Sequence, residues 1–252
     1  MSDGGGRLGR VELRAGYREW SPPAALRPTV SCLWTSVIPS GGRTLVLPDA
    51  CADLIWQVGA GAHVAGPDTG PAPSVLPSGT VLVGVRFAPG GGGPALGLPL
   101  TELRDQRVDL ADLHPGLAKR LPGDLSPGAA LGRLIEMTAG LVSEGPPDPL
   151  VSRGARLLAN SRERTDELAR DLGVSERQFR RRCQDAVGYG PKTLHRVLRF
   201  RRFVSRIDVA DDGVDLARVA AEAGYADQAH LTRESVRLAG LPPAALIRAR
   251  RA

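Results

Sequence analysis

Short hydrophobic runs, each broken by turn residues, fill the first hundred residues of the chain. Some alternate between apolar and polar positions, and others, such as 80–87, are rich in β-branched residues and too short for a helix. The stretches between them, such as Pro-Ser-Gly-Gly at 39–42, have the composition of turns. Many short strands joined by Gly and Pro turns favour a sandwich or a small barrel. We predict strands over residues 29–38, 43–47, 52–58, 62–65 and 80–87.

The hydrophobic period changes beyond residue 99. Apolar positions from Leu131 to Val142 recur every three or four residues, which predicts a helix. The proline-rich stretch 145–149 then excludes both helix and strand pairing, so we expect a domain boundary there. Helical spacing dominates the rest of the chain. Helices are predicted at about 150–160, 165–172, 175–186, 191–207, 215–223, 227–238 and 243–250.

Capping residues mark the ends of these helices. Ser175 has capping-box spacing with Gln178, and Pro191 suits a first helical position. Glycine ends a helix at little cost because it tolerates a positive φ. We assign N-caps to Thr165, Ser175 and Asp227, and helix ends to Gly173, Gly188, Gly224 and Gly240.

Composition excludes several classes of protein. The chain has 252 residues, enough for one large domain or two ordinary ones, and 42% of them are hydrophobic. No stretch approaches the roughly 18 uncharged apolar residues of a membrane span, and the first ten residues lack the apolar segment of a signal peptide. We therefore expect a cytoplasmic protein with no membrane partner. Its three cysteines fit reduced thiols and cannot supply a four-cysteine zinc site.

Charge is distributed unevenly along the chain. Residues 1–150 hold 12 Lys and Arg against 14 Asp and Glu, whereas residues 151–252 hold 21 against 13. Two domains with different architectures and partners are the simplest interpretation. Between residues 175 and 206 there are ten Lys and Arg against two acidic residues, which concentrates positive charge where a polyanion could bind.

Two segments of the basic half, 165–188 and 215–240, share one plan. Each has a short helix, a turn with a glycine, and a longer helix that closes at another glycine. Each is predicted to be a helix-turn-helix unit, whose second helix can enter the major groove of DNA. The segment 191–207 between them has one apolar face and is expected to be a rigid linking helix. The predicted core faces are Leu168, Ala169, Leu172, Val174, Phe179 and Cys183 in the first unit and Leu216, Val219, Ala220, Tyr225, Leu231 and Leu238 in the second.

Outward positions of the two second helices carry side chains that suit DNA. A row of arginines on a helix is by itself commonly just solvated surface, but its place on the second helix of a paired unit favours DNA contact. Arginine can donate two hydrogen bonds to guanine or neutralise a phosphate, and a mixed polar set can contact adenine, thymine and phosphate. The candidate contacts are Arg177, Arg180 and Arg181 in the first unit and Gln228, Ala229, His230, Thr232 and Arg233 in the second.

This half of the chain resembles the AraC/XylS family of bacterial transcription regulators. The resemblance rests on the separation of the two units, the Gly190-Pro191 entry to the linking helix and the sequence AEAGYADQAHLTRE at 221–234, and it covers about residues 155–250. It implies two helix-turn-helix units that lie on one face of the DNA and enter successive major grooves. It also implies DNA contacts at the candidate positions, apart from Thr232.

The N-terminal half is similar to a domain found ahead of this output module in many bacterial regulators. The resemblance rests on residues 17–20, 47–56, 64–67 and 83–87, and it implies a cupin-like β domain that serves as a sensor or dimerisation unit. Ligand sites combine aromatic walls with a few placed polar groups. Candidate pocket residues are Trp34, Cys51, Trp56, His63 and Arg86, with ordinary core or strand surface as the alternative for each.

Catalysis and metal chemistry lack their usual motifs. A metal-dependent cupin enzyme would need closely spaced histidines, but His63 and His114 are about 50 residues apart. The sequence holds no nucleophile elbow, P-loop or dinucleotide-binding turn, and residues 90–93 are expected to form a loop. Cys51 lies between two aspartates, which oppose the lowered thiol pKa of a redox sensor. We expect no enzyme activity, no cofactor and no metal.

The sequence therefore predicts an α+β protein of two domains. A disordered N-terminus over 1–16 precedes a β-rich domain over 17–145. This domain is predicted to be a cupin-like barrel or sandwich with a helical C-terminal part, and to serve as a sensor or oligomerisation domain. A linker over 146–150 leads to an all-α DNA-binding domain over 150–252, with two helix-turn-helix units joined by a linking helix.

The predicted function is sequence-specific transcription regulation, controlled by a signal at the N-terminal domain. The predicted partner is double-stranded DNA in its major groove; an unidentified small-molecule effector, RNA polymerase and a second copy of the chain are further candidates. Two alternatives remain open. One is a small-molecule-binding or metal-dependent β-domain enzyme with a helical tail, and the other is a nucleoid-type protein that binds DNA without sequence preference.

Overall fold

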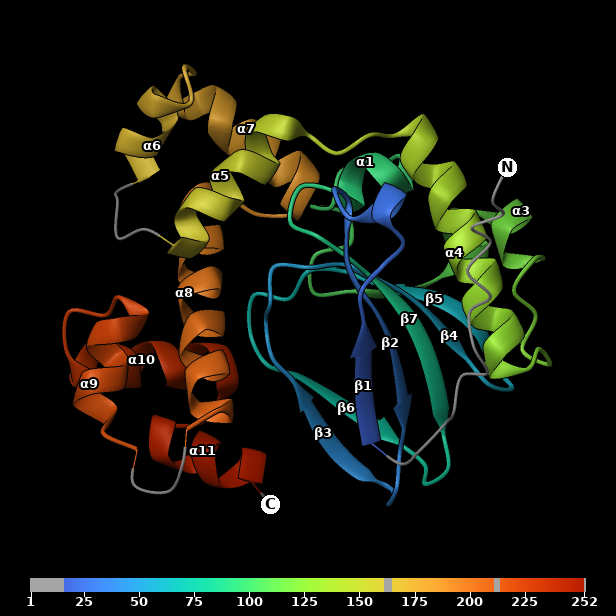
Figure 1. Ribbon diagram of the computed structural model, residues 1–252, viewed down its shortest axis with the longest axis horizontal. Helices are drawn as coiled ribbons and strands as arrows, with labels where there is room; N and C mark the ends of the chain where they lie inside the picture. Colours follow the sequence, from blue (N-terminus) through green and yellow to red (C-terminus); the bar gives the residue numbers. More distant parts are fainter. Residues whose placement is uncertain (1–15, 161–164, 211–213, 252) are drawn as a thin grey trace, which may run out of the picture.

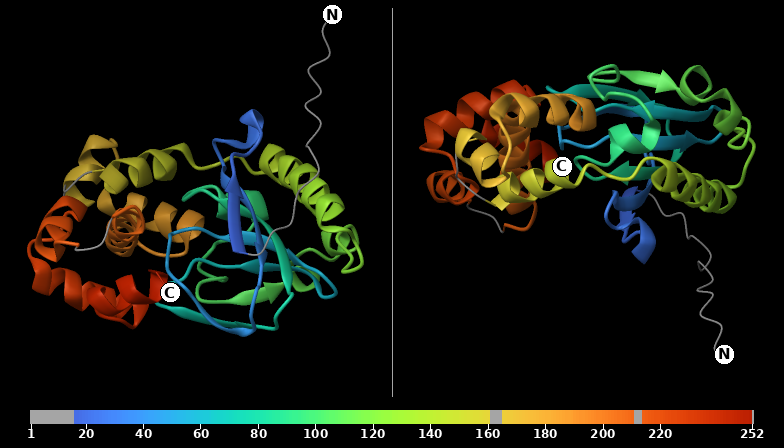
Figure 2. Two further views of the ribbon diagram at one scale, coloured as in Figure 1. Left: turned by 60° about the horizontal axis from the view of Figure 1, so that its bottom comes forward. Right: turned by 90° about the horizontal axis from the view of Figure 1, so that it is seen from above.

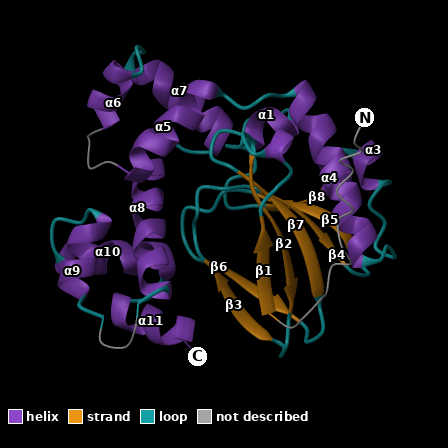
Figure 3. Cartoon of the chain, in the orientation of Figure 1, coloured by secondary structure: helices purple, strands orange, loops and turns teal. Residues whose placement is uncertain are grey.

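A computed structural model describes residues 16–160, 165–210 and 214–251. A β-rich domain precedes a helical region, which confirms the predicted α+β order (Figures 1 and 3). The disorder expected over residues 1–16 lies outside the described residues, apart from Gly16, which begins β1. The strands are β1 Gly16–Trp20, β2 Val30–Val37, β3 Gly42–Val46, β4 Asp53–Gln57, β5 Gly61–Ala65, β6 Ala72–Leu76, β7 Val81–Phe87 and β8 Arg107–Asp109.

Among the described residues, helices of the first half lie beside the sheets, and seven more begin after residue 148. Those of the first half are the 3-10 helix Ala24–Leu26, α1 Gly92–Leu96, α2 Leu110–Leu113, α3 Pro115–Ala118 and α4 Pro127–Glu144. Those of the second half are α5 Pro149–Asn160, α6 Thr165–Asp171, α7 Glu176–Val187, α8 Pro191–Asp208, α9 Leu216–Ala223, α10 Gln228–Ala239 and α11 Pro243–Arg251. Residues 146–148 of the linker expected at 146–150 lie between α4 and α5, whereas residues 149 and 150 begin α5, because proline suits the first helical position.

Six strands form an antiparallel sheet in the order β1-β2-β7-β4-β5-β8, and β3 pairs with β6 in a second sheet of two strands. The cupin-like barrel or sandwich stays a prediction. The five predicted strands are confirmed to within one residue at each end. Strands β1, β6 and β8 were not predicted, because β1 is mostly exposed, β8 has three residues, and β6 contains Pro73, which a two-stranded sheet tolerates.

The two faces of the larger sheet have different environments. Because side chains alternate along a strand, the register places one set against α1 and α4 in the main core of the domain and the other set on the opposite face. The core set includes Leu33, Leu54, Val64 and Val85, which lie side by side on four strands. The opposite set is Cys32, Trp34, Ile55 and Ala65.

The glycine-rich stretch expected to be a loop is partly helical. Helix α1 begins at Gly92, one residue beyond its N-cap Gly91, and ends at Leu96, before its C-cap Gly97, whose φ is 70°. A Cβ atom on Gly91 would lie 2.7 Å from the carbonyl oxygen of Thr29. The loop expected over 90–93 is thus present at Gly90 and Gly91, but the expectation was wrong for Gly92 and Gly93, which are helical. Glycine is needed at position 91 because backbone approaches backbone there.

The helical region has a single hydrophobic core. All seven predicted helices are confirmed, and residues from both helix-turn-helix units pack against the apolar face of α8 in one cluster. Ser175 and Gln178 form the predicted capping box, and Asp227 accepts a hydrogen bond from the amide of His230. The predicted glycine ends have positive φ at Gly173, Gly188, Gly224 and Gly240.

The two domains pack side by side. Figure 2 shows, from two further directions, that the C-terminal helices lie against one end of the β-rich domain while α4 lies at the other. Ala50 of the β-rich domain is buried in the core cluster of the helical region. Among the described residues, no helix combines the length and the apolar character needed to cross a membrane.

Gly84 supports the packing of Trp34 and gives a test of the fold. The two residues are partners across β2 and β7, and a Cβ atom at position 84 would overlap the indole ring. Gly84→Ala should lower the free energy of unfolding by about 1–3 kcal/mol, because overpacking forces the ring out of place. Gly132→Ala on α4, where a Cβ atom meets nothing within 4 Å, is the matched control and should not destabilise. Urea unfolding of both variants checks this, and equal stabilities would contradict it.

Candidate functional site

The second helices of the two helix-turn-helix units, α7 and α10, begin at fixed positions. The Ser175 hydroxyl oxygen accepts a hydrogen bond from the amide of Gln178, and Gln178 Oε1 in turn accepts one from the backbone amide of Ser175. Asp227 accepts from the amide of His230 at 2.6 Å. Such caps satisfy amides that a helix N-terminus leaves free. The first turns of both helices, which carry the candidate DNA contacts, are therefore well formed.

Helix α7 presents one basic face and one apolar face. Arg177, Arg180 and Arg181 are exposed, whereas Phe179 and Cys183 are buried in the core. Arg182, the next arginine, is occupied elsewhere, because its Nε donates to Asp148 Oδ2 at 2.7 Å. The three predicted arginines therefore lie together on a surface that a polyanion can reach.

Helix α10 exposes Gln228, Ala229 and Arg233. His230 is half-buried, with its ring edge-on to the ring of Tyr225 at 5.3 Å and its Nε2 atom 3.5 Å from Arg199 Nη2. The hydroxyl group of Thr232 donates a hydrogen bond to the carbonyl of Gln228, with an oxygen–oxygen distance of 2.9 Å. Both His230 and Thr232 thus have contacts inside the domain, and their contact with DNA stays a prediction.

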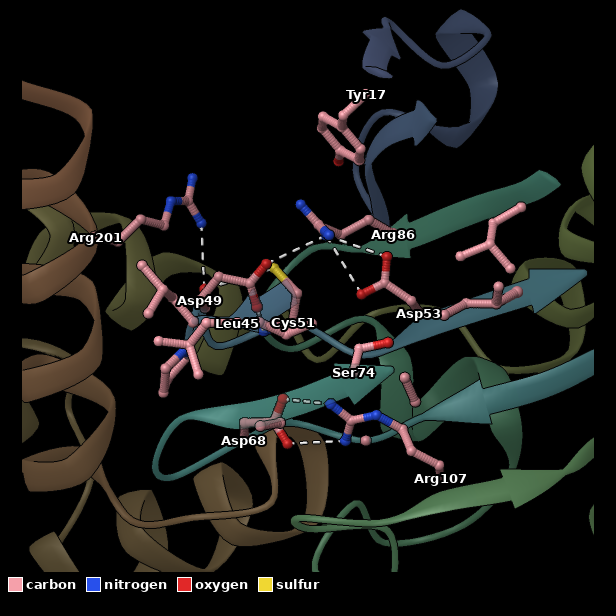
Figure 4. Close-up of a pocket in the computed structure, with 18 of the residues that line it drawn as sticks. Tyr17, Leu45, Asp49, Cys51, Asp53, Asp68, Ser74, Arg86, Arg107 and Arg201 are labelled. Carbon is pink, nitrogen blue, oxygen red and sulfur yellow. Dashed lines mark hydrogen bonds and ion pairs between the residues drawn. The ribbon is translucent and has the colours of Figure 1, made fainter. Parts of the chain in front are cut away.

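A cavity of about 1070 Å³ lies between the two β-sheets and the helical domain (Figure 4). The larger sheet lines it with residues such as Ile55, the β3–β6 pair with residues such as Ser74, and α8 with Arg201 and Val204. Asp208 at the end of α8 and Arg250 of α11 complete the wall. Both domains therefore contribute to one cavity.

Three of the five predicted pocket residues, Cys51, His63 and Arg86, line this cavity. Trp56 lies in the main core, on the other face of the sheet, where its Nε1 donates to the carbonyl of Pro122. Trp34 is buried behind the cavity wall, and its Nε1 donates to Asp53 Oδ1 at 2.6 Å. A ligand-binding role for the three that line the cavity stays a prediction.

Arg86 is surrounded by three carboxylates. Its Nε lies 3.1 Å from Asp53 Oδ1 and 3.2 Å from Asp49 Oδ2, and its Nη1 lies 3.4 Å from Glu19 Oε1. Burial raises the pKa of Asp53 to about 6, against the lowering effect of Arg86, and Asp49 raises it further. One guanidinium group therefore does not fully compensate the negative charge gathered here.

Cys51, beside this cluster, has an unreactive environment. The side chain is buried, its amide donates to Asp49 Oδ1, and burial followed by the charge of Asp49 raises the pKa of its thiol well above the usual value. A thiolate is the reactive form of cysteine. The environment therefore favours the structural interpretation of Cys51 over a redox sensor.

Two further arginines of the cavity are paired with aspartates, and a third reaches a backbone carbonyl. Arg107 makes two hydrogen bonds to Asp68, at 2.8 and 2.6 Å. Arg250 does the same with Asp208, and Arg201 reaches the carbonyl of Asp49 at 3.4 Å. Across the described residues, no three His, Cys, Asp or Glu side chains gather as metal ligands would.

Sequence reasoning missed the acidic residues of the cavity. Asp53 begins a strand whose residues are almost all buried, and Arg86 lies near the end of another. A charged residue in a buried strand is rare unless it is paired. That signal pointed to these two positions, but it could not show that they face each other.

Two helix-turn-helix units that share one core and expose the first turns of their second helices, of which α7 is strongly basic, define the chain as a DNA-binding transcription regulator. Comparison with protein families gives its type. The family described as "Helix-turn-helix domain" matches residues 168–249, and "Domain of unknown function (DUF6597)" matches residues 18–109. The chain therefore carries a DUF6597 domain followed, toward the C-terminus, by an AraC-type helix-turn-helix domain, which confirms the resemblance found in the sequence.

Solved structures of ToxT from Vibrio cholerae are similar to this chain. One at 1.65 Å resolution is 10% identical, covers 85% of this chain and 97% of ToxT, and has a TM-score of 0.49. A structure with a bound unsaturated fatty acid is 11% identical over 84% of this chain and 88% of ToxT, with a TM-score of 0.42. No curated protein matches the chain.

The raised pKa of Asp53 predicts a pH dependence of stability. Because the folded chain holds this proton more tightly than the unfolded chain, the Asp53 contribution to stability falls as the pH rises from about 4 through about 6. Asp53→Asn carries no such proton. The free energy of unfolding of the variant, minus that of the wild type, should therefore increase between pH 4 and pH 7, by up to roughly 3 kcal/mol. Urea unfolding at both pH values measures it, and a constant difference would contradict the assignment.

Proposed function

We propose that the chain is a sequence-specific regulator that binds double-stranded DNA in the major groove through α7 and α10. The observation that carries the proposal is the arrangement of α7, where Arg177, Arg180 and Arg181 are exposed while the opposite face is held in the core. Exposed arginine on the first turns of a recognition helix can reach base edges or phosphates.

The second unit would contribute a less basic set of contacts. Gln228, Ala229 and Arg233 are exposed, and His230 and Thr232 lie beside them at the start of α10. Because both units pack on α8 in one cluster, they would meet the DNA as one body and occupy successive grooves. A cytoplasmic location follows from this partner. RNA polymerase and a second copy of the chain stay predicted partners.

The proposal differs from its two rivals in what DNA it binds. A nucleoid-type protein would bind all duplexes alike through phosphate contacts, and a β-domain enzyme with a helical tail would need no DNA. Selection of duplexes from a random pool by the full chain should enrich one shared sequence, and binding to it should weaken as salt rises. Retention of all sequences alike would favour the nucleoid-type alternative.

Arg181→Ala tests the role of α7. We expect about tenfold to hundredfold weaker binding to the selected duplex, with relaxed preference at one base pair, because a bidentate contact to guanine is lost. Fluorescence anisotropy with a set of single-base-pair variants measures this. Arg133→Ala, an exposed arginine on α4, is the matched control and should bind as the wild type does. Equal weakening on every duplex would make Arg181 a phosphate contact.

We also propose that a small molecule in the cavity controls DNA binding. The cavity is lined by both domains, so a ligand within it would favour one arrangement of the domains over another, and by linkage would alter DNA affinity. The charge of the walls favours a neutral or cationic effector over an anionic one, because six carboxylates face four guanidinium groups. These are Glu19, Asp49, Asp53, Asp68, Asp105 and Asp208 against Arg86, Arg107, Arg201 and Arg250.

A pair of probes with opposite head charge tests this preference. Octylamine should raise the melting temperature of the full chain by several degrees, whereas octanoate should not, because binding only the folded state stabilises it. Ser74→Trp, which places an indole in the cavity, should remove the effect of octylamine. A larger shift with octanoate would overturn the proposed charge preference.

A further inference from the structure

The C-terminal end of α7 is held by the N-terminal domain. The amide of Leu100 donates to the carbonyl of Asp185 at 2.8 Å, and Arg104 Nη1 donates to the carbonyl of Gly188 at 3.5 Å. The last carbonyl groups of a helix have no partner within the helix. Here two of these carbonyl groups accept hydrogen bonds from donors in the other domain, far away in the sequence.

The fit between the domains is close enough to require glycine on both sides. A Cβ atom on Gly93 of α1 would lie 2.5 Å from the carbonyl oxygen of Asp185. A Cβ atom on Gly188, the C-cap of α7, would lie 2.7 Å from Pro67 Cγ and 2.9 Å from the carbonyl oxygen of Leu100. The end of the first recognition helix therefore rests directly on the N-terminal backbone.

The residues that hold α7 belong to two loops, 66–69 and 98–106, which we call the capping loops. They are bonded to each other, because the amide of Gly66 donates to the carbonyl of Gln106 and the amide of Asp105 donates to the carbonyl of Pro67. Thr69 donates to Asp105 through both its amide and its hydroxyl. The two loops are therefore expected to move together.

The capping loops also form part of the cavity wall. Gly66, Asp68 and Asp105 line the cavity, and Asp68 is joined to Arg107 by two hydrogen bonds (Figure 4). The loops thus touch the cavity on one side and the end of α7 on the other. The chain continues to Pro71, whose Cγ would lie 3.7 Å from a Cβ atom on Gly240, the C-cap of α10.

We propose that the N-terminal domain caps the first recognition helix, and that this docked arrangement is the one that binds DNA. The cap holds residues 185–188, while the candidate DNA contacts Arg177, Arg180 and Arg181 remain exposed in the first half of α7. Docking therefore supports the helix without covering its DNA-binding face. The capping loops are then the route by which the cavity acts on DNA binding, and this regulation rests on the function proposed above.

Gly93→Ala in the full chain tests the cap. Hydrogen exchange of the Leu100 amide, whose acceptor is in the other domain, should become at least tenfold faster, and affinity for the selected duplex should fall about tenfold. Gly132→Ala adds the same methyl group in open space on α4 and should change neither. Arg104→Gln removes the hydrogen bond to the carbonyl of Gly188 without a steric clash, so the cap can still be tested if Gly93→Ala does not fold. Arg120→Gln removes the same charge from another exposed arginine and is its control.

Asp68→Asn tests the connection to the cavity, because it weakens the pair with Arg107 without touching α7. It should change Leu100 exchange and DNA affinity in the same directions as Gly93→Ala, by a smaller factor. In the wild type, adding DNA should slow Leu100 exchange, since linkage is reciprocal.

Several outcomes would overturn the proposal. Unchanged Leu100 exchange in Gly93→Ala and Arg104→Gln would show that the cap does not form, and faster exchange with unchanged or tighter DNA binding would show that the docked arrangement is not the DNA-binding one. No effect of Asp68→Asn on either measurement would remove the connection to the cavity. Wild-type protein that binds no DNA would instead refute the proposed function, since Leu100 exchange without DNA still reports the cap.

Discussion

The burial of one face of α8 is the interaction on which the arrangement of the DNA-binding domain depends. Leu194, Val197, Phe200, Phe203 and Ile207 are all nearly fully buried along this helix, and the core residues of both helix-turn-helix units belong to the same cluster. Protein cores pack as densely as organic crystals, so neither unit can shift along α8 without opening cavities. The same helix also carries Arg201, which lines the cavity between the domains. One helix thus sets the spacing of the two recognition helices and forms a wall of the site proposed to control them.

The helical half could be predicted from sequence because its signals are local. Capping side chains such as Ser175 and Asp227 bond to amides two or three residues away, and left-handed glycines end helices where they stand. The β-rich half is different. Helix α1 looks like a loop in the sequence because of the glycines at its start. Gly91 and Gly93 are needed where the backbone approaches the carbonyls of Thr29 and Asp185, and both of these are distant along the chain. Strand β6 exists because β3 pairs with it, and its own sequence, with Pro73, argues against a strand.

The candidate sites follow the same division. Exposure of the three α7 arginines could be predicted from helical spacing, since Phe179 and Cys183 fix which face is buried. Pocket residues were harder, because the sequence does not reveal which face of a sheet looks into a cavity. Trp34 and Trp56 are both aromatic and both buried, yet the first packs behind the cavity wall and the second in the core on the far side of the sheet. The acidic character of the cavity arises from residues on separate strands and loops, which only the fold brings together.

The cavity has a consequence for how the protein is made. Its walls come from strands that are synthesised early and from Asp208 of α8 and Arg250 of α11, which are synthesised later. Two hydrogen bonds join Arg250 to Asp208. The strands that line the cavity therefore precede α8 and α11 in synthesis, and until these helices are added the cavity lacks the walls that they supply. The effector site proposed for this cavity is therefore complete only once α11 has joined the fold.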